Sequence, residues 1–431
     1  MTPEVKKRIE QIRQGIVPEG YVKDKDGIYP RDWASKKIGQ WLKLAERSII
    51  LQDEEEYQLV TIRRGFGGVD SRGSFLGKNV LVKNYFIVKT GDFIISKRQI
   101  AHGACGIVPP ELDGAVVSNE YNVFLPQDGT NIQMFNLMMQ LPHYKRLFYL
   151  MSDGVHIEKL LFKTQDWMKR TLAMPLLKEQ KKIAEILATQ DKAIELQARK
   201  IEELKRFKKG CLEKMFPRKG QKVPEKRFPG FMDDWERRKL GSIYEAIGNA
   251  FVGTATPYYV ENGHFYLESN NIKDGQINHN TEVFINDEFY EKQKDKWLHT
   301  GDMVMVQSGH VGHAAVIPEE LDNSAAHALI MFRHPKIEIE PYFLNYQYQT
   351  LKSKKKIENI TTGNTIKHIL ASDMQQFEVD MPKLEERKKI AEYFRGLDRL
   401  IALHQCKLEE MKRQKKALMQ LLLTGIVRVR L

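Results

Sequence analysis

The chain contains an internal repeat, and this repeat constrains its fold more than any other feature of the sequence. Residues 174–185 read MPLLKEQKKIAE, and residues 381–392 read MPKLEERKKIAE. The register between the two copies stays constant over about two dozen further residues, where identical residues recur from Asp191 and Asp398 onward. Matches at so many aligned positions indicate that one structural unit occurs twice.

The repeat extends upstream of these segments, so that it divides the whole chain. Residues 32–39 are echoed by residues 234–241, which share Asp-Trp followed by Lys, then Ile or Leu, then Gly. The segment GDFII at 91–95 is echoed by GDMVM at 301–305. A chain of 431 residues is also longer than one hydrophobic core usually serves. We expect four parts, namely a first globular domain with an N-terminal leader helix (1–173), a first long helix (174–217), a second globular domain (218–380) and a second long helix (381–431).

Both long helices carry a stripe whose positions follow alternating steps of four and three residues. The mean step of 3.5 predicts that the two helices pair as a left-handed coiled coil, although a core helix of a larger bundle would also carry an apolar stripe. Pro175 and Pro382 mark the helix starts, where a missing N–H is tolerated. Lys208 and Lys415 fall on the stripe, so we expect weaker pairing near them. The predicted apolar seam consists of Ile183, Leu187, Ile194, Ile201, Leu204, Ile390, Phe394, Leu397, Ile401, Leu408, Met411 and Leu418.

The globular parts combine strands, glycine-rich turns and helices, and this mixture predicts an α+β fold for each. Residues 57–62, 93–96 and 303–306 have the composition of strands. Residues 135–150 and 341–356 have the pattern of helices. The two globular parts share only a sparse framework and differ in their loops, which favours two recognition modules that bind different targets.

Composition narrows the class of protein. A hydrophobic content of 42% excludes a disordered or fibrous chain. Three cysteines without any C-x-x-C pair exclude a disulfide scaffold and a cysteine-based zinc site. The charged N-terminus lacks the apolar core of a signal peptide, and no apolar run reaches the roughly 20 residues that span a bilayer. We therefore expect a cytoplasmic protein that does not enter a membrane.

Familiar catalytic motifs are absent from the sequence. No G-x-x-x-x-G-K-[ST], H-E-x-x-H or G-x-S-x-G occurs, nor do the N-P-P and D-P-P motifs of amino-methyltransferases. We expect no catalysis, no cofactor and no bound metal in this chain. An enzyme that uses an unfamiliar set of residues stays open as an alternative.

Positive charge is concentrated in residues 199–227, which hold twelve Lys or Arg against four acids. The whole chain has a net charge of +12, so this segment accounts for most of the excess. Such a segment is either a solvated helix face and linker or a contact to the DNA backbone.

Polar and basic loops next to predicted strands are the candidate reading edges, because Arg reads guanine and Asn or Gln reads adenine through paired hydrogen bonds. Ordinary surface charge is the alternative for each of them. The spacing of His310 and His313 is also compatible with two metal ligands. No third ligand is spaced nearby, so a polar loop is the preferred interpretation. The candidates are Arg63, Arg64, Lys97, Arg98, Gln99 and His102 in the first domain, and Thr254, Tyr259, Asn270, Asn271, Gln307, Ser308, His310 and Asn364 in the second.

Three repeated motifs together resemble one family. They are the W-x₃–₄-K-[IL]-G entry, the G-D-hydrophobic strand and the helix start M-P-x-L-x-E-[QR]-K-K-I-A-E, found twice about 207 residues apart. The chain resembles the specificity (S) subunit of type I restriction–modification enzymes over nearly its whole length. The charged leader at 1–20 has no counterpart before Trp235, and we expect it to pack near the C-terminus.

The resemblance implies a function for each part. Two target recognition domains would each grip one half of a bipartite, asymmetric site on double-stranded DNA. The two helices would form an antiparallel coiled coil that acts as spacer and docking platform. The implied partners are two modification subunits that methylate adenine and two restriction subunits that translocate and cut DNA, and S-adenosylmethionine, ATP and Mg²⁺ would bind only to them. The alternative from another class is a coiled-coil scaffold whose terminal domains bind proteins.

Overall fold

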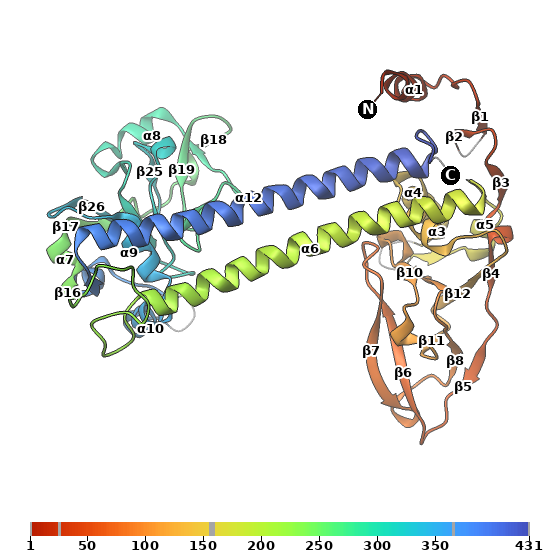
Figure 1. Cartoon of the computed structure of the whole chain (residues 1–431), viewed down its shortest axis with the longest axis horizontal. Coiled ribbons are helices and arrows are strands. Elements are labelled where there is room, and N and C mark those ends of the chain that lie inside the picture. The colour runs from red at the N-terminus through yellow and green to blue at the C-terminus, as the bar shows by residue number, and fades with distance from the viewer. Residues whose placement is uncertain (1, 25–26, 155–159, 364–366, 430–431) are drawn as a thin grey trace. The chain divides into compact units, whose positions relative to one another are not determined.

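The computed structural model describes residues 2–24, 27–154, 160–363 and 367–429 (Figure 1). The chain divides into two compact units. The first unit is Met1–Leu196 with Leu408–Leu431, and the second is Gln197–Lys407. Each unit contains one globular part and a stretch of both long helices, α6 (Leu177–Met215) and α12 (Leu384–Leu423).

Two sheets form the globular part of the first unit. The four-stranded sheet has the order β10-β9-β12-β4, and its neighbouring strands are antiparallel. The five-stranded sheet has the order β5-β8-β11-β6-β7, in which β11 and β6 run parallel. The strands are β4 (Leu42–Leu44), β5 (Ser48–Ile50), β6 (Glu56–Ile62), β7 (Val69–Leu76), β8 (Asn84–Ile87), β9 (Phe93–Ser96), β10 (Cys105–Ile107), β11 (Val116–Ser118) and β12 (Tyr121–Pro126).

Short helices and two-stranded ladders complete the first unit. Phe93, Phe124, Phe135, Phe148 and Trp167 are fully buried and join the four-stranded sheet to the helices that cover it. The remaining elements are α1 (Pro3–Arg13), β1 (Tyr21–Asp24) paired with β2 (Gly27–Pro30), β3 (Ala34–Lys37) paired with β15 (Thr171–Met174), α2 (Ile38–Trp41), α3 (Ile132–Met139), α4 (Pro142–Leu150), β13 (Ser152–Asp153) paired with β14 (Leu161–Phe162), and α5 (Thr164–Met168).

The second unit repeats this design with a different set of loops. Its first four-stranded sheet has the order β17-β26-β23-β24 and its second the order β18-β22-β19-β25. The strands are β16 (Glu236–Lys239) paired with β27 (Glu378–Met381), β17 (Tyr244–Asn249), β18 (Tyr259–Val260), β19 (His264–Leu267), β20 (Ile272–Lys273) paired with β21 (Gln276–Ile277), β22 (Phe284–Ile285), β23 (Met303–Val306), β24 (Ala314–Val316), β25 (Ala325–Ala326) and β26 (Leu329–Pro335). The helices are α7 (Leu240–Ile243), α8 (Asp287–Glu291), α9 (Pro341–Tyr348), α10 (Leu351–Ile360) and α11 (Ala371–Gln376).

The two units share one scaffold, which confirms the α+β prediction for a tandem repeat. The sheet β4-β12-β9-β10 has the same order of neighbours, and the same place in the chain, as the sheet β17-β26-β23-β24. In both units a two-stranded ladder, β3 with β15 or β16 with β27, leads directly into a long helix.

The helical stretches predicted at 135–150 and 341–356 are found, and each consists of two helices. The first becomes α3 and α4, because Pro142 has no N–H for an interior helical bond and instead starts a new helix. The second becomes α9 and α10, because the hydroxyl of Thr350 caps α10 by accepting a hydrogen bond from the backbone N–H of Ser353 at 3.3 Å.

The long helices α6 and α12 pack against each other in antiparallel fashion (Figure 1). In the second unit Gln197 lies opposite His404, and Lys208, further along α6, lies opposite the earlier residue Asp398 of α12. Gln197 donates from Nε2 to the backbone oxygen of His404 at 2.8 Å. The repeat equates these two positions, so the contact joins corresponding points of the two copies.

All the predicted seam residues are buried or half-buried, and four of them, Ile183, Leu187, Ile390 and Phe394, also belong to the hydrophobic cores of the globular parts. Both helices begin two residues after the expected prolines, at Leu177 and Leu384, because strands β15 and β27 keep the chain extended up to the residue before each proline. The buried seam residues are Ile183, Leu187, Ile201, Ile390, Phe394 and Ile401, and the half-buried ones are Ile194, Leu204, Leu397, Leu408, Met411 and Leu418.

The expected weakening at the two seam lysines is wrong, because each lysine forms an ion pair across the helices. In the second unit Lys208 Nζ lies 2.7 Å from the carboxylate of Asp398, which also accepts a hydrogen bond from Tyr346. In the first unit Lys415 Nζ lies 2.5 Å from Asp191. A lysine at a seam position is therefore compatible with pairing when an acid on the facing helix reaches it.

Replacing Lys208 with Ala is expected to lower the free energy of unfolding by about 3–5 kcal/mol, because Asp398 is then left largely buried without its countercharge. The double variant Lys208→Met/Asp398→Asn removes both charges and keeps an acceptor for Tyr346, so its loss should be about 1 kcal/mol or less. Urea unfolding of the full chain measures both. Equal losses in the single and double variants would show that the buried charge has no part in the effect.

The start of each long helix is anchored by a buried glutamate and an arginine that follows the opposite helix. In the first unit Arg428 makes two 2.7 Å hydrogen bonds to Glu179 and also bridges to Asp32. Hydrogen bonding to Arg428 lowers the pKa of Asp32 below its usual value. In the second unit Arg227 makes two 2.7 Å hydrogen bonds to Glu386. Both units therefore contain the same arginine–glutamate contact, although Arg428 and Arg227 lie in segments whose sequences differ.

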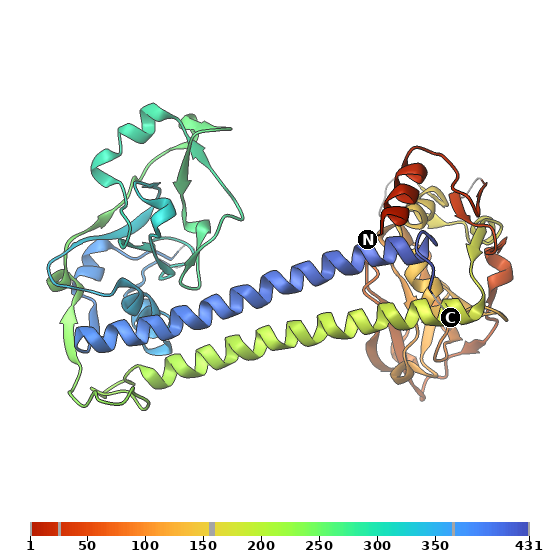
Figure 2. The ribbon, with the colours of Figure 1, turned by 45° about the horizontal axis from the view of Figure 1, so that its top comes forward.

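The leader helix α1 packs beside the C-terminal segment of the first unit (Figure 2). Arg8 Nη1 donates to the backbone oxygen of Ile426 at 2.5 Å, and the hydroxyl of Tyr21 donates to the oxygen of Gly425 at 2.7 Å. Gly425 has φ +69°, and a Cβ there would lie 2.5 Å from Pro30, so this close approach requires glycine. The expected packing of the leader near the C-terminus is therefore found.

Candidate nucleic-acid interface

In the first unit, the structure brings two separate candidate loops together. Arg63 and Arg64 follow β6 and open the turn to β7. The backbone N–H groups of Gly65 and Phe66 donate to the oxygens of His102 and Gly103 at 2.7 and 2.8 Å. The arginine turn and the loop that follows β9 therefore form one continuous edge.

Two arginines on this edge, Arg63 and Arg98, already have acidic neighbours. Arg63 is exposed and forms an ion pair with Asp70. Arg98 makes a bidentate contact with Glu120, with its Nε 2.6 Å from Oε2. Exposed pairs of this kind contribute little to stability, so a phosphate or a guanine can exchange with the carboxylate at small cost. Arg64 is also exposed.

The other candidates of the first unit lie at the base of the same edge. Lys97, Gln99 and His102 are half-buried. The backbone oxygen of Lys97 accepts a 3.0 Å hydrogen bond from the N–H of Phe162, which fixes the loop after β9. Among the described residues, Oε1 of Gln99 is buried without a hydrogen-bond partner. A buried acceptor left unpaired is costly, and a bound donor would remove that cost.

In the second unit, the loop after β23 occupies the corresponding place. The backbone oxygen of Gln307 accepts from the N–H of Ile369 at 3.1 Å, and the N–H of Gly309 donates to the oxygen of Lys367 at 3.1 Å. Ser308 forms an isolated bridge with His368. The loop at 307–313 and the segment that precedes α11 therefore form one edge, although they are far apart in sequence. Asn364 belongs to this segment but lies outside the described residues.

A cavity of about 300 Å³ opens beside this edge, and His310 and His313 line it. Burial lowers the pKa of His313, so its imidazole is neutral at pH 7. Nδ1 of His313 lies 3.3 Å from the backbone N–H of Asp274 and accepts from it, which places the proton on Nε2. Lys354 and Lys367 also line the cavity. Neither lysine is singled out in the sequence analysis; the Lys-rich run at 352–356 contains Lys354, whereas Lys367 stands alone in a loop.

The remaining candidates of the second unit are placed elsewhere. Tyr259 donates its hydroxyl to Glu268 at 2.7 Å, and burial together with this bond raises its pKa to about 12. Thr254 and Asn270 are exposed. Asn271 is buried, and its amide donates to the oxygens of Asn278 and Thr281 at 3.0 and 2.8 Å. A base could reach Asn271 only by displacing one of these internal bonds.

Much of the positive charge of the segment 199–227 is neutralised by ion pairs within the chain. Arg218 and Lys214 pair with Glu225, Lys222 pairs with Asp234, and Arg227 pairs with buried Glu386. These contacts fix the turn that follows α6. They favour the linker reading of this segment over a continuous contact to the DNA backbone.

Two α+β domains of one design, each leading into a long helix and each carrying a loop edge of different chemistry, define a tandem recognition protein. A family model described as "Type I restriction modification DNA specificity domain" matches residues 30–206 and 232–413. The chain therefore belongs to the family of specificity (S) subunits of type I restriction–modification systems, whose members are not the catalytic component of their complexes.

Known proteins of this family match over nearly the whole chain. The chain is 23% identical over 422 residues to the type I restriction enzyme MjaVIII specificity subunit of Methanocaldococcus jannaschii, covering 93% of this chain and 94% of that protein. Two solved structures share the fold. A chain from a study of complex assembly and conformational transition of the type I R-M system has a TM-score of 0.60 at 17% identity, covering 93% of this chain and 99% of that one. The S subunit from M. genitalium has a TM-score of 0.53 at 12% identity, covering 90% and 96%.

Two kinds of feature are absent from the described part of the chain. Within the described ranges, no group of three or more His, Cys, Asp or Glu side chains is arranged to hold a metal ion. Likewise, none of the described helices combines the length and the apolar character needed to cross a membrane.

Proposed function

We propose that this chain is the sequence-specific DNA-binding subunit of a type I restriction–modification complex. Each globular domain reads one half of a bipartite, asymmetric site on double-stranded DNA. The first domain reads through the edge that carries Arg63, Arg64 and the loop 97–102, and the second through the loop 307–313 with its neighbours.

One observation carries this proposal. The loops after β9 and β23 occupy corresponding places on one scaffold, and each is fixed by backbone hydrogen bonds from a segment that follows α4 or α10. The frame is the same, but the side chains differ: Lys97-Arg98-Gln99 stand in one loop and Gln307-Ser308-Gly309 in the other. Such a frame supports two readers with different targets, because base edges are discriminated by side-chain donors and acceptors.

The paired helices act as spacer and docking platform in this proposal. Two modification subunits and two restriction subunits assemble with the chain and supply all catalysis. S-adenosylmethionine, ATP and Mg²⁺ bind to those subunits, and this chain needs none of them. Lys208, Asp398 and their counterparts Asp191 and Lys415 hold the register of the helices on which the partners assemble.

Salt dependence of duplex binding tests the proposal. The chain assembled with its modification subunit is expected to bind duplex DNA with an affinity that falls steeply with salt, with a log–log slope of about −0.9 per phosphate contact. The purified chain with duplex, Mg²⁺ and S-adenosylmethionine, but without partners, should neither cut nor methylate. Absence of duplex binding in the assembled complex would instead favour a scaffold whose terminal domains bind proteins, and turnover by the chain alone would favour an enzyme.

A further inference from the structure

Strands β6 and β7 form an antiparallel ribbon at the border of the five-stranded sheet (Figure 1). β7 is the last strand in the order β5-β8-β11-β6-β7, so its outer edge has no neighbour in this sheet. Its eight residues extend over about 25 Å, and the end of β6 leads directly into the turn of Arg63 and Arg64. Because the major groove of a duplex admits a two-stranded ribbon, this element has suitable dimensions for reading DNA.

A β-bulge interrupts the pairing of the ribbon and places Arg72 outside the ladder. Leu59 and Val60 are neighbours on β6. Their partners on β7 are Gly73 and Ser71, so Arg72 between them has none. Gly73 has φ +112°, a conformation that glycine adopts without strain. Bulges of this kind redirect a side chain and are frequent at sheet borders, and the side chain of Arg72 is exposed.

Arg72 lies on the face of the ribbon that carries the ion pair of Arg63 with Asp70. Thr61 and Asp70 are paired residues, and the side chains of such a pair share one face. Burial raises the pKa of Tyr121, whereas a hydrogen bond with Thr61 and the charge of Arg72 oppose this rise. Arg72 therefore lies near Thr61, on the face that leads to the recognition edge of the first domain.

Arg72 differs from two other arginines of this surface in having no acidic partner. Arg63 pairs with Asp70, and Arg98 pairs with Glu120. Within the described ranges, the guanidinium of Arg72 forms neither an ion pair nor a hydrogen bond. An arginine held by a carboxylate must exchange that partner before it contacts DNA, whereas the N–H donors of Arg72 need no exchange.

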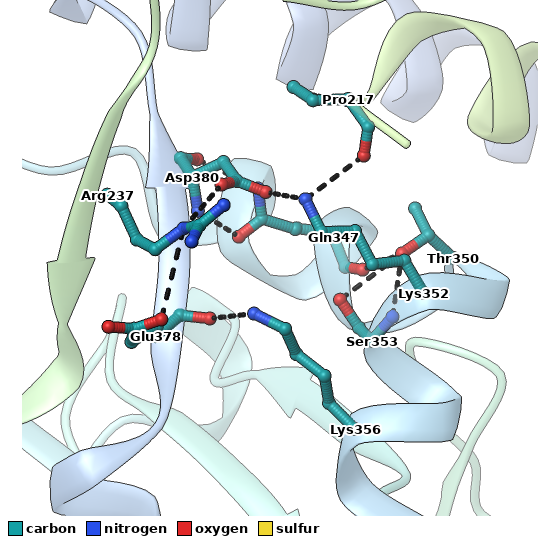
Figure 3. Close-up of polar contacts among 9 residues, drawn as sticks. All are labelled: Pro217, Arg237, Gln347, Thr350, Lys352, Ser353, Lys356, Glu378 and Asp380. Atoms are coloured by element: carbon teal, nitrogen blue, oxygen red, sulfur yellow. Dashed lines mark hydrogen bonds and ion pairs between the residues drawn. The ribbon is translucent and has the colours of Figure 1, made fainter. Parts of the chain in front are cut away.

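A cation with a structural role has a different environment, as Lys352 of the second unit shows. Lys352 and other cations line a hollow of about 340 Å³ between the end of α6 and the start of α10. Lys352 forms an ion pair with buried Asp380, and its Nζ donates to the oxygen of Pro217 at 3.2 Å (Figure 3). Lys356 donates to a backbone oxygen of β27 at 3.1 Å. The described residues provide no such contact for Arg72, so its guanidinium has no part in holding the fold.

Charge is distributed unevenly along the ribbon. Residues 53–56, which lead into β6, read Asp-Glu-Glu-Glu and are all exposed. Arg63 and Arg64 follow the other end of β6, and Arg72 lies opposite its middle. Because phosphates are repelled by the acidic end and attracted by the basic end, a duplex is expected at the end of the ribbon that carries the arginines.

The ribbon also distinguishes the first domain from the second. The sheet β18-β22-β19-β25 of the second unit likewise contains one parallel pair, β19 with β25. Its strands are only two to four residues long, so the described part of this sheet has no counterpart of the eight-residue strand β7. An element confined to one domain suits a determinant of one half-site.

We infer that the β6–β7 ribbon enters the major groove of the half-site read by the first domain, where the guanidinium of Arg72 donates to O6 and N7 of a guanine. The inference rests on the proposed function and adds a specificity-determining residue to it. Arg63 and Arg64 contact the duplex next to this guanine, from the turn at the end of the ribbon.

Two variants of Arg72 test the inference in the complex with the modification subunit. Arg72→Ala is expected to lower discrimination at one base pair of one half-site roughly 5- to 150-fold and to leave the other half-site unchanged. Arg72→Lys keeps the charge but lacks the paired donors, so the same loss is expected with an unchanged salt slope. Methylation mapping measures discrimination, and circular dichroism verifies the fold of each variant.

Arg31→Ala is the matched control. Arg31 is exposed in the segment between β2 and β3, and it too forms no ion pair among the residues that the structure describes. Its replacement removes the same charge from a place outside the ribbon, so both half-sites should stay as in the wild type.

Replacing the guanine identified by this mapping with 7-deazaguanine tests the groove. This base lacks the N7 acceptor, which faces the major groove. The wild-type complex should bind the modified duplex about tenfold more weakly, since a hydrogen bond from a charged donor is lost. The Arg72→Ala complex has no such bond to lose and should bind both duplexes equally. Fluorescence anisotropy of labelled duplexes measures the four affinities.

The contrary outcomes are distinct from one another. Unchanged half-sites in Arg72→Ala overturn the inference and leave the proposed function intact. Uniformly weaker binding of all sequences, with a salt slope smaller by about 0.9 and rescue by Arg72→Lys, makes Arg72 a phosphate contact and also overturns it. Equal losses on 7-deazaguanine in the wild type and Arg72→Ala assign N7 to another residue and refute the contact. Failure of the wild-type complex to bind duplex at all contradicts the proposed function itself.

Discussion

Inserting seven residues into both long helices is expected to lengthen the non-specific spacer of the DNA site and to leave both half-sites unchanged. The insertions belong between Ile194 and Leu204 in α6 and between Ile401 and Met411 in α12. Seven residues equal two steps of 3.5, so the seam stays in register. At about 1.5 Å per residue they add about 10 Å, which corresponds to about three base pairs.

Both helices must be lengthened together for a structural reason. The ion pair of Asp191 with Lys415 belongs to the first unit, and that of Lys208 with Asp398 belongs to the second. Both pairs keep their partners only if the stretch between them grows equally in α6 and α12. Three added base pairs also rotate one half-site by more than a quarter of a turn, since the duplex repeats every 10–10.5 base pairs. Affinity should therefore fall even where the new site is correctly recognised.

Methylation mapping with the reconstituted modification complex measures the new site. Insertion of five residues at the same two places is the control, because it displaces the seam by a fraction of a turn and should prevent pairing of the helices. A changed half-site sequence with a constant spacer would contradict the assignment of the helices as the spacer.

Substitutions in the two recognition edges are expected to affect one half-site each. Arg63→Ala and Arg64→Ala should relax recognition of one half only, and Gln307→Ala should relax the other. Loss of one bidentate contact to a base costs about 1–3 kcal/mol, or roughly 5- to 150-fold in discrimination at that position. Methylation mapping of each variant complex reads both halves in one experiment.

Asn271 provides a contrasting variant for this experiment. Its amide is buried and bonded to the backbone of Asn278 and Thr281, so Asn271→Ala should destabilise the second domain and lower binding without changing the preferred bases. If Arg63→Ala or Gln307→Ala weakens both half-sites to the same degree, those side chains hold phosphates or support the fold instead of reading bases.

Much of the architecture follows from local patterns in the sequence. The motif MPxLxE[QR]KKIAE locates both long helices, and the 4-3 spacing identifies residues such as Ile183 and Ile390 that the structure buries. Periodicity succeeds here because a helix places every third or fourth residue on one face whatever surrounds it. Strands β9 and β23 were predicted at their bounds for a similar reason, since short apolar runs bounded by turn residues favour strands.

The polar residues were predicted less well, because their environment depends on segments far away in the sequence. From the sequence, Lys208 is expected to weaken the pairing of the helices. Only the fold shows that Asp398 on the facing helix forms an ion pair with it. From the sequence, Asn271 is a candidate for contacting DNA bases. Only the fold shows that its amide closes an internal loop. From the sequence, residues 199–227 form a basic segment. Only the fold shows that Arg227 in this segment is bound to Glu386.

Local patterns in the sequence establish the tandem repeat of one α+β unit and the apolar stripe on both long helices, because repetition and hydrophobic period are local properties of the chain. Only the folded chain reveals which charges are neutralised, which loops form a common edge and which basic residues gather around the hollow beside α10. These features depend on contacts between distant segments. No spacing along the chain encodes the partner that a buried or half-buried polar group finds.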